Sequence, residues 1–253
     1  MEFLIIMNSF KSSAELKGMA KEQLFGNYGN AVGATVVTGL IMMVMFFILE
    51  IFSAFTIGGS VSVPQLIIYF LISFIVSLFN GLLTSGKAFF YLKITCGQPA
   101  AISDIFYGFR VYPDKALIIQ FFLSLFTFVC ELPMIIFYLL YIFHPENVVY
   151  LLLMSICSVA GSIATIIVSL IFSQSFYLLQ DFPQYSAKEL LNMSLQIMKG
   201  HKGRLFYIVV SFIPLYILGT FSCCIAFLWI VPYTNTIMAN FYMDLMRGRS
   251  GQN

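Results

Sequence analysis

Charge is the scarcest property of this sequence. Only 9% of the 253 residues are charged, whereas an ordinary soluble domain carries about 25%. The net charge of +2 provides no basic surface of the size that nucleic-acid binding requires. These shortages argue against a soluble globular domain and against a nucleic-acid partner.

Metal-binding and catalytic patterns are also missing. The five cysteines are scattered and form no CxxC pair, and the adjacent Cys223 and Cys224 have no nearby histidine or further cysteine to complete a zinc site. The sequence contains no HExxH, GxSxG, P-loop or paired-carboxylate pattern. We therefore expect no metal, no cofactor and no catalytic residue, and a protein that is not an enzyme.

Long apolar runs are what the sequence has in abundance. Hydrophobic residues make up 60% of the chain, and most of the apolar runs are long enough to cross a hydrocarbon core about 30 Å thick. A transmembrane barrel would show alternating segments of about 10 residues instead. The predicted fold is an all-α, polytopic membrane protein, a single domain over 1–253. Its six transmembrane helices form three hairpins, at about 31–52, 66–86, 116–143, 148–172, 205–221 and 225–243.

The distribution of Lys and Arg predicts the orientation. Three of the 13 lie in the N-terminal segment, four in 87–115, four in 181–204 and two in the C-terminal tail, while the opposite loops hold none. Short loops rich in Lys and Arg stay in the cytoplasm. We therefore expect a multi-pass protein of the cytoplasmic membrane with both termini cytoplasmic.

A polar, amphipathic segment precedes each predicted hairpin. Ser12 with Glu15, and Ser186 with Glu189, have the capping-box spacing that starts a helix. We interpret these segments as interfacial helices on the inner leaflet, with basic residues facing anionic headgroups. The candidate headgroup contacts are Lys199, His201, Lys202 and Arg204. The expected partners are the lipid bilayer and, as a further candidate, another membrane protein.

Three Phe-Tyr pairs suggest an internal repeat: Phe90-Tyr91, Phe176-Tyr177 and Phe241-Tyr242. Each pair lies at the inner end of an even-numbered helix. The preceding hinges lie 61, 62 and 38 residues earlier, counted from Gly29, Asp114 and Gly203. We interpret 12–92, 103–179 and 186–245 as parallel repeats. The alternative is that these aromatic pairs reflect the general enrichment of such rings at membrane interfaces.

Glu131 is the sharpest candidate for a functional residue. Fifteen uncharged residues precede it back to Ala116, and 12 follow it to Phe143. A carboxylate at that depth is costly and marks a proton, cation or substrate site by default. Its candidate neutral partners are Asn80, Gln120, Gln174 and Asn235. The alternative is a protonated, hydrogen-bonded Glu131 that cements helix packing.

Both ends of the chain resemble a known family. The stretch ELKGMAKEQLFGNYGNAV near the start, and MKGHKGRLFYIVVSFIPLYILG with LWIVPYTNTIMANFYMDL near the end, resemble the bacterial integral membrane proteins grouped as domain of unknown function 975. The resemblance covers essentially the whole chain and is weakest in the middle repeat. It implies a six-helix topology and brings no established activity or catalytic residues.

Three functional hypotheses follow. The first is a non-catalytic accessory or envelope factor that contacts lipid or a membrane partner, favoured by the small outer loops and the basic amphipathic segments. The second is a small-solute or ion transporter that uses Glu131. The third, a membrane enzyme acting on lipid, has the least support, because Glu131 is the one ionisable group deep within a span.

Overall fold

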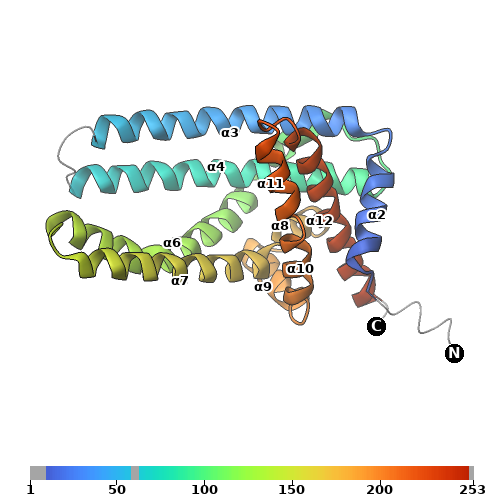
Figure 1. Ribbon diagram of the computed structural model, residues 1–253. Coiled ribbons are helices and arrows are strands. Elements are labelled where there is room, and N and C mark those ends of the chain that lie inside the picture. The colour runs from blue at the N-terminus through green and yellow to red at the C-terminus, as the bar shows by residue number, and fades with distance from the viewer. Residues whose placement is uncertain (1–9, 58–62, 251–253) are drawn as a thin grey trace.

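The chain is almost entirely helical. The computed structural model describes residues 10–57 and 63–250, and every regular element in these ranges is a helix (Figure 1). This confirms the predicted all-α class, while most of the first outer loop, 58–62, lies outside the described residues. The elements are α2 (Ser13–Leu24), α3 (Tyr28–Ile57), α4 (Val63–Thr95), η1 (Ile102–Phe106), α5 (Tyr107–Arg110), α6 (Pro113–Phe143), α7 (Val148–Phe172), α8 (Ser175–Asp181), α9 (Ala187–Ile197), α10 (Lys202–Val210), α11 (Ile213–Phe221) and α12 (Phe227–Ser250).

Within the part of the chain that the structure describes, five helical segments are long and apolar enough to cross a membrane: Tyr28–Phe52, Ile67–Thr95, Pro113–Phe143, Val148–Asp181 and Lys202–Phe221. They contain or closely match the first five predicted spans. The sixth predicted span, 225–243, falls mostly on α12, which is not among the five. The structure is that of a multi-pass membrane protein, and the count of six spans stays a prediction.

The two hairpins α3–α4 and α6–α7 form long arms that extend from a common base (Figure 1). Beyond the base, their apolar side chains are largely uncovered by protein. Leu40 on α3, Leu71 on α4, Val129 on α6 and Ile156 on α7 are 53–65% exposed. Such a surface is stable in hydrocarbon and not in water, because a soluble protein rarely exposes contiguous apolar patches of this extent. The arms therefore account for the membrane-embedded part of the molecule.

The hydrophobic core lies in the base. It is formed by α2, α9, the start of α3, the end of α4, η1, α8 and α12, and its fully buried side chains include Leu16, Leu24, Ile105 and Leu190. The apolar faces of α2 and α9 were expected to rest on lipid. In the structure much of each face is buried inside the protein, because α2 packs on α12 and α4 while α9 packs on α6, α7 and α8.

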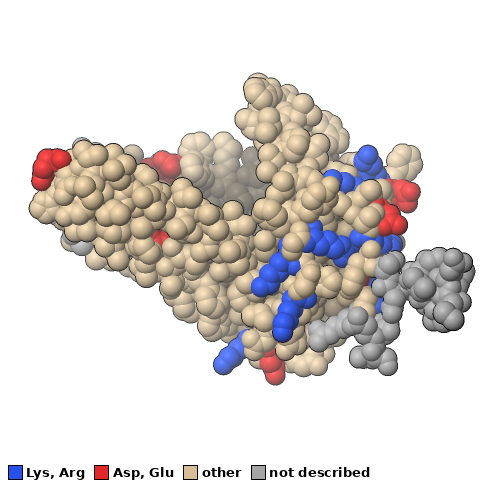
Figure 2. All heavy atoms as spheres, turned by 60° about the horizontal axis from the view of Figure 1, so that its bottom comes forward, with Lys and Arg blue, Asp and Glu red and all other residues tan. Residues whose placement is uncertain are grey.

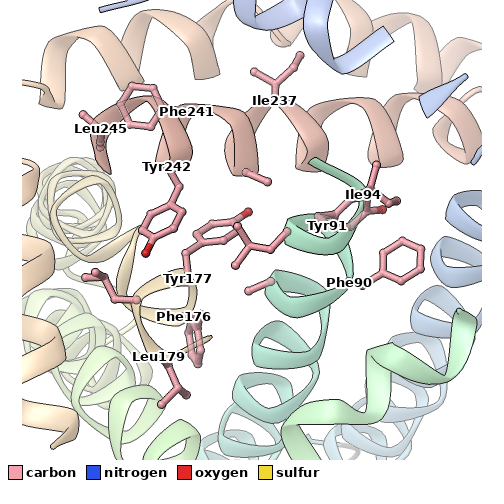
Figure 3. Close-up of a cluster of buried hydrophobic side chains, with 14 of the residues drawn as sticks. Phe90, Tyr91, Ile94, Phe176, Tyr177, Leu179, Ile237, Phe241, Tyr242 and Leu245 are labelled. Carbon is pink, nitrogen blue, oxygen red and sulfur yellow. The ribbon is translucent and has the colours of Figure 1, made fainter. Parts of the chain in front are cut away.

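All three Phe-Tyr pairs meet in this core, each pair on a different helix: α4, α8 and α12 (Figure 3). The ring of Tyr177 stacks on that of Tyr242 with centroids 5.3 Å apart, and Figure 3 shows Tyr91 on the other side of Tyr177. The hydroxyl of Tyr242 donates to Asp181 over 2.6 Å. The pairs therefore hold three helix ends together inside the protein, where they are at most 8% exposed.

The caps and hinges that precede the hairpins have the local geometry that their residues favour. The hydroxyls of Ser12 and Ser186 accept from the backbone N–H groups of Glu15 and Glu189, and each glutamate accepts from the backbone of its serine, so both capping boxes are confirmed. These hydrogen bonds from the serines hold the pKa values of the two carboxyls below their usual range. The hinges use left-handed residues: Gly26 (φ 86°), Tyr112 (φ 53°) and Gly200 (φ 88°).

The basic side chains gather on the base. Figure 2 shows Lys and Arg at the end of the molecule away from the hairpin turns of the two arms, and none of them on the visible surface of the arms. The basic residues therefore share one end of the molecule, and the cytoplasmic orientation of that end stays a prediction.

The close approach of α4 to η1 at Gly86 provides a test of the packing. A Cβ on Gly86 of α4 would overlap the carbonyl oxygen of Ile105 in η1. We therefore expect Gly86→Ala to lower the free energy of unfolding by about 1–3 kcal/mol, the usual cost of overpacking, and to lower the midpoint of thermal unfolding in detergent. The control is Gly39→Ala on α3, where a Cβ meets nothing within 4 Å. That variant should be unchanged or slightly more stable, because alanine is the better helix former; equal midpoints for the two variants would contradict this packing.

Candidate functional site

A groove separates the first arm from the second. It lies between α4 and the pair α6–α7, has a volume of about 790 Å³, and is called the arm groove below. Aromatic side chains contribute much of its wall, and two of them, Phe70 and Phe128 on facing helices, meet edge to face with their centroids 6.2 Å apart. The wall residues used below are Ser73, Ser77, Gln120, Ser124, Thr127 and Glu131.

A polar cluster joins α4 to α6 in the wall of the arm groove. The hydroxyls of Ser77 and Ser124 are 2.6 Å apart across α4 and α6, and the amide of Gln120 donates to both over 3.2 Å. Gly81 makes this possible, because any side chain there would overlap Gln120. In hydrocarbon such a cluster is stable only when its members pair with one another, so it fixes where the two arms touch.

Glu131 lies further along the same wall, near the middle of α6. Its Oε1 accepts from the hydroxyl of Thr165 on α7, at 3.5 Å, which is a long hydrogen bond. Gly161, one turn earlier on α7, leaves room for the carboxylate: a Cβ there would lie 3.0 Å from Oε2 of Glu131. Pro133 lies within α6 without ending the helix. Glu131 is therefore weakly bonded within the protein and reaches the groove.

A second polar group in the groove lacks a partner. The hydroxyl oxygen of Ser73 is buried and makes no hydrogen bond among the described residues. Because α4 and α6 run antiparallel with Ser77 beside Ser124, Ser73 is level with Thr127, one helical turn before Glu131. The groove wall thus contains a buried, unsatisfied hydroxyl and a weakly bonded carboxyl group at neighbouring depths.

The structure does not bring together the polar residues predicted to surround Glu131. Asn80 is on α4 and does not line the groove. Gln174 is fully buried at the junction of α7 and α8, where its amide donates to Ser173. Asn235 is on α12, and its amide donates to the carbonyl of Val231 one turn earlier. Gln120, named among the neutral partners, shares the groove but lies three turns before Glu131.

The basic segment before α10 divides into exposed and paired groups. Lys199 is exposed, whereas the guanidinium of Arg204 is 2.5 Å from the carboxylate of Asp244 and also donates to the carbonyl of Lys11. Burial, followed by the charge of Arg204, lowers the pKa of His201, so its imidazole is uncharged at pH 7. Arg204 therefore ties the chain ends together, and the charge available to a lipid headgroup comes from Lys199 and Lys202.

The sequence of the chain matches one known protein family. Residues 7–249 match the family described as "Protein of unknown function (DUF975)". The chain belongs to this family. No curated protein matches the chain. No solved structure matches it either.

The sequence alone identified Glu131 as a candidate site residue but not Thr165, its hydrogen-bond partner. Thr165 lies in an apolar run in which a lone threonine carries no signal by itself. The spacing of Gly161 and Thr165, which puts two small residues on one face of α7, indicates where a neighbouring helix can approach closely. The same spacing in Gln120 and Ser124 on α6 could have identified the groove cluster.

Substitutions of Arg204 and Asp244 test the ion pair of the base. Arg204→Ala and Asp244→Ala should each lower the free energy of unfolding by about 3 kcal/mol, because each leaves a largely buried partner charge unpaired. The double variant should lose little more than the worse single variant, as measured by thermal unfolding in detergent. Lys199→Ala, an exposed basic residue of the same segment, is the matched control and should change stability by less than about 0.5 kcal/mol. Additive losses in the double variant would refute the pairing.

Proposed function

We propose that this protein is a non-catalytic accessory factor of the cytoplasmic membrane that binds a lipid-like molecule in the arm groove. The observation that carries the proposal is the groove wall, in which an unpartnered hydroxyl and a weakly bonded carboxyl group face a space otherwise lined by apolar side chains. Both termini are proposed to be cytoplasmic, which the gathering of Lys and Arg on the base supports (Figure 2).

The dimensions of the groove favour a chain over a helix. Its wall on α6 extends from Gln120 to Tyr138, which is about 27 Å at the helical rise of 1.5 Å per residue. The volume of about 790 Å³ then corresponds to a mean cross-section of about 30 Å². A helix with side chains is 10–12 Å wide and needs about 80 Å² or more. The arm groove therefore fits one extended chain.

The polar groups define which chain would be preferred. Lipid tails are as apolar as the groove wall, so a plain acyl chain gains nothing from leaving the bilayer. A chain with a hydrogen-bond donor partway along its length can pair with Ser73 or Glu131, which have no good partner otherwise. We therefore propose an amphipathic chain with a hydroxyl, amide or amine group at mid-membrane depth as the ligand.

The internal repeat over 12–92, 103–179 and 186–245 is part of the same proposal. Two observations support it. The three Phe-Tyr pairs occupy corresponding ends of α4, α8 and α12 and share one core (Figure 3), and each hinge carries one left-handed residue, at Gly26, Tyr112 and Gly200.

A pair of lipid probes tests the ligand. Proteoliposomes would contain two photoactivatable phosphatidylglycerols that differ only by a hydroxyl group midway along one acyl chain. We expect the hydroxylated lipid to crosslink to α4, α6 and α7 about fivefold more, since a hydrogen bond within the membrane contributes about 1 kcal/mol. Equal crosslinking of the two lipids would reject the proposed ligand class.

Two matched variants on α6 test whether the preference for the hydroxylated lipid arises in the arm groove. Thr127→Trp places a large side chain in the arm groove and should abolish the preference for the hydroxylated lipid. Val129→Trp adds the same side chain two residues along, outside the groove and at a 53% exposed position, and should preserve the preference. The same response in both variants would place binding elsewhere.

Transport is the second candidate function, and Glu131 favours it. Its carboxyl group lines the groove near the middle of α6 with one long hydrogen bond, so it can exchange a proton or contact a cation. Glu131→Gln should then abolish a proton-coupled flux into proteoliposomes while leaving the thermal midpoint close to that of the wild type. Wild-type flux in this variant would remove Glu131 from any transport mechanism.

A further inference from the structure

The C-terminal hairpin differs in direction from the two arms. It consists of α10 and α11, the turn at 222–226, and α12 as far as Met243. Figure 1 shows α10 and α11 running across α3 and α4, whereas the two arms extend along them. Helices with such different directions cannot all cross one flat bilayer.

Hydrogen bonds between distant residues limit the number of crossings. The backbone N–H of Lys11 donates to both carboxylate oxygens of Asp244, at 3.2 and 3.3 Å, and the guanidinium of Arg204 contacts both residues. Lys11, Arg204 and Asp244 therefore lie on the same side of the membrane. An even number of crossings must separate any two of them, so the C-terminal hairpin crosses twice or not at all. Five spans are excluded.

The length of α12 decides between the two remaining cases. Asn240 and Gln23 exchange two side-chain hydrogen bonds, of 2.6 and 3.1 Å, and Gln23 also donates to the carbonyl of Thr95. Asn240 is therefore held in the base. From Phe227 to Asn240 the helix extends 13 residues, about 20 Å, which is short of the hydrocarbon thickness of about 30 Å.

The other half of the hairpin, Lys202–Phe221, has 20 residues, about 30 Å, so its length alone would allow a crossing. It is interrupted at Ser211 and Phe212, between the nine-residue helices α10 and α11. The part of α3 that extends beyond the buried base, 40–57, has 18 residues and is about 27 Å long, compared with about 20 Å for α12 up to Asn240. A hairpin crosses only when both of its halves span the hydrocarbon, so the short α12 half is the one that argues against a crossing.

The surface of the hairpin fits the boundary between headgroups and acyl chains. Its inner side chains, Leu205, Ile208 and Phe212, are buried, while large apolar residues face outward. The outward set contains the chain's single tryptophan and two tyrosines, which prefer the headgroup level. These residues are Tyr207, Ile213, Tyr216, Ile217, Phe221 and Trp229, all at least 40% exposed.

We infer that the C-terminal hairpin, 202–243, lies in the plane of the cytoplasmic leaflet, with phospholipid covering its outward face, and that the chain crosses the membrane four times. Lys199 and Lys202 stand at the start of the hairpin and meet anionic headgroups there. The third copy of the proposed repeat has 38 residues between Gly203 and Phe241 against 61 and 62 in the others, and its α12 half is the part that is too short to cross. This inference does not depend on the arm groove.

Two native cysteines at the tip provide the test. Cys223 and Cys224 are exposed in the turn, and a variant with Cys96, Cys130 and Cys157 replaced by Ala retains only these two. The reference is a variant without native cysteines that carries Glu146→Cys, in the turn between α6 and α7, where the side chain is 75% exposed. Intact cells and inverted membrane vesicles would be treated with a membrane-impermeant maleimide.

The inference expects the tip and the reference to react from opposite membrane sides. With the expected orientation, Glu146→Cys is labelled in intact cells, while labelling of Cys223 and Cys224 falls to the level of the cysteine-free protein and is recovered in inverted vesicles. If the whole protein had the opposite orientation, both results would exchange: the in-plane hairpin and the four crossings would stand, and the assignment to the cytoplasmic leaflet would be overturned. Labelling of tip and reference from the same side would overturn it.

A second measurement covers the case in which lipid shields the thiols on both sides. A short hydrophilic epitope inserted between Ser222 and Cys223 must emerge into water on one side. Antibody binding on the side opposite to an epitope inserted at Glu146 supports the in-plane hairpin, and binding on the same side overturns it. Thermal midpoints close to that of the wild type show that the insertions leave the base folded.

Discussion

Lipid tails are as apolar as the helices that they surround, and this constraint explains why the hydrophobic core lies in the base and not between the arms. Apolar burial cannot hold two helices together inside hydrocarbon. The protein accordingly concentrates its core in the base, where α2, α4, α8, α9 and α12 bury their apolar side chains against one another. The arms project from this core with their surfaces in lipid. A hydrogen bond between Ser77 and Ser124 and the small residue Gly81 allow the two arms to meet, and Gly161 allows α7 to approach α6 within the second arm.

The same constraint gives the arm groove its chemistry. Where Ser77, Ser124 and Gln120 satisfy one another, the arms meet, and where Ser73 and Glu131 have no adequate partner, a space remains between them. A polar group that would be unremarkable on a soluble surface is costly at this depth. In the proposed function, the selectivity of the groove therefore comes from these two polar groups, because the apolar wall does not distinguish one lipid chain from another.

Much of the fold could be predicted from sequence, because apolar run length, capping boxes and the distribution of Lys and Arg are local signals. They identified the helical class, the first four long helices and both helix starts at Ser12 and Ser186. The burial of Leu16 and Leu190 could not be predicted, because an amphipathic pattern does not tell whether the apolar face meets lipid or protein. The direction of α10 and α11 was equally hidden, since composition measures whether a segment can cross a membrane and not how it is oriented. In the site, Glu131 was conspicuous as a lone charge, but Thr165 and Ser73 have meaning only once the helices are packed.

The contact between Lys11 and Asp244 has a consequence for the order in which the protein is made. The two residues are 233 positions apart, so the bonds that close the base must wait until nearly the whole chain has been synthesised. The arms can enter the membrane earlier, because each is a hairpin of consecutive helices. Until α12 arrives, α2 and the inner ends of α3 and α4 lack the helix against which they pack. The late-synthesised α12 is thus the helix that locks α2, which is made much earlier, and a chain truncated before α12 would have its arms inserted and its base open.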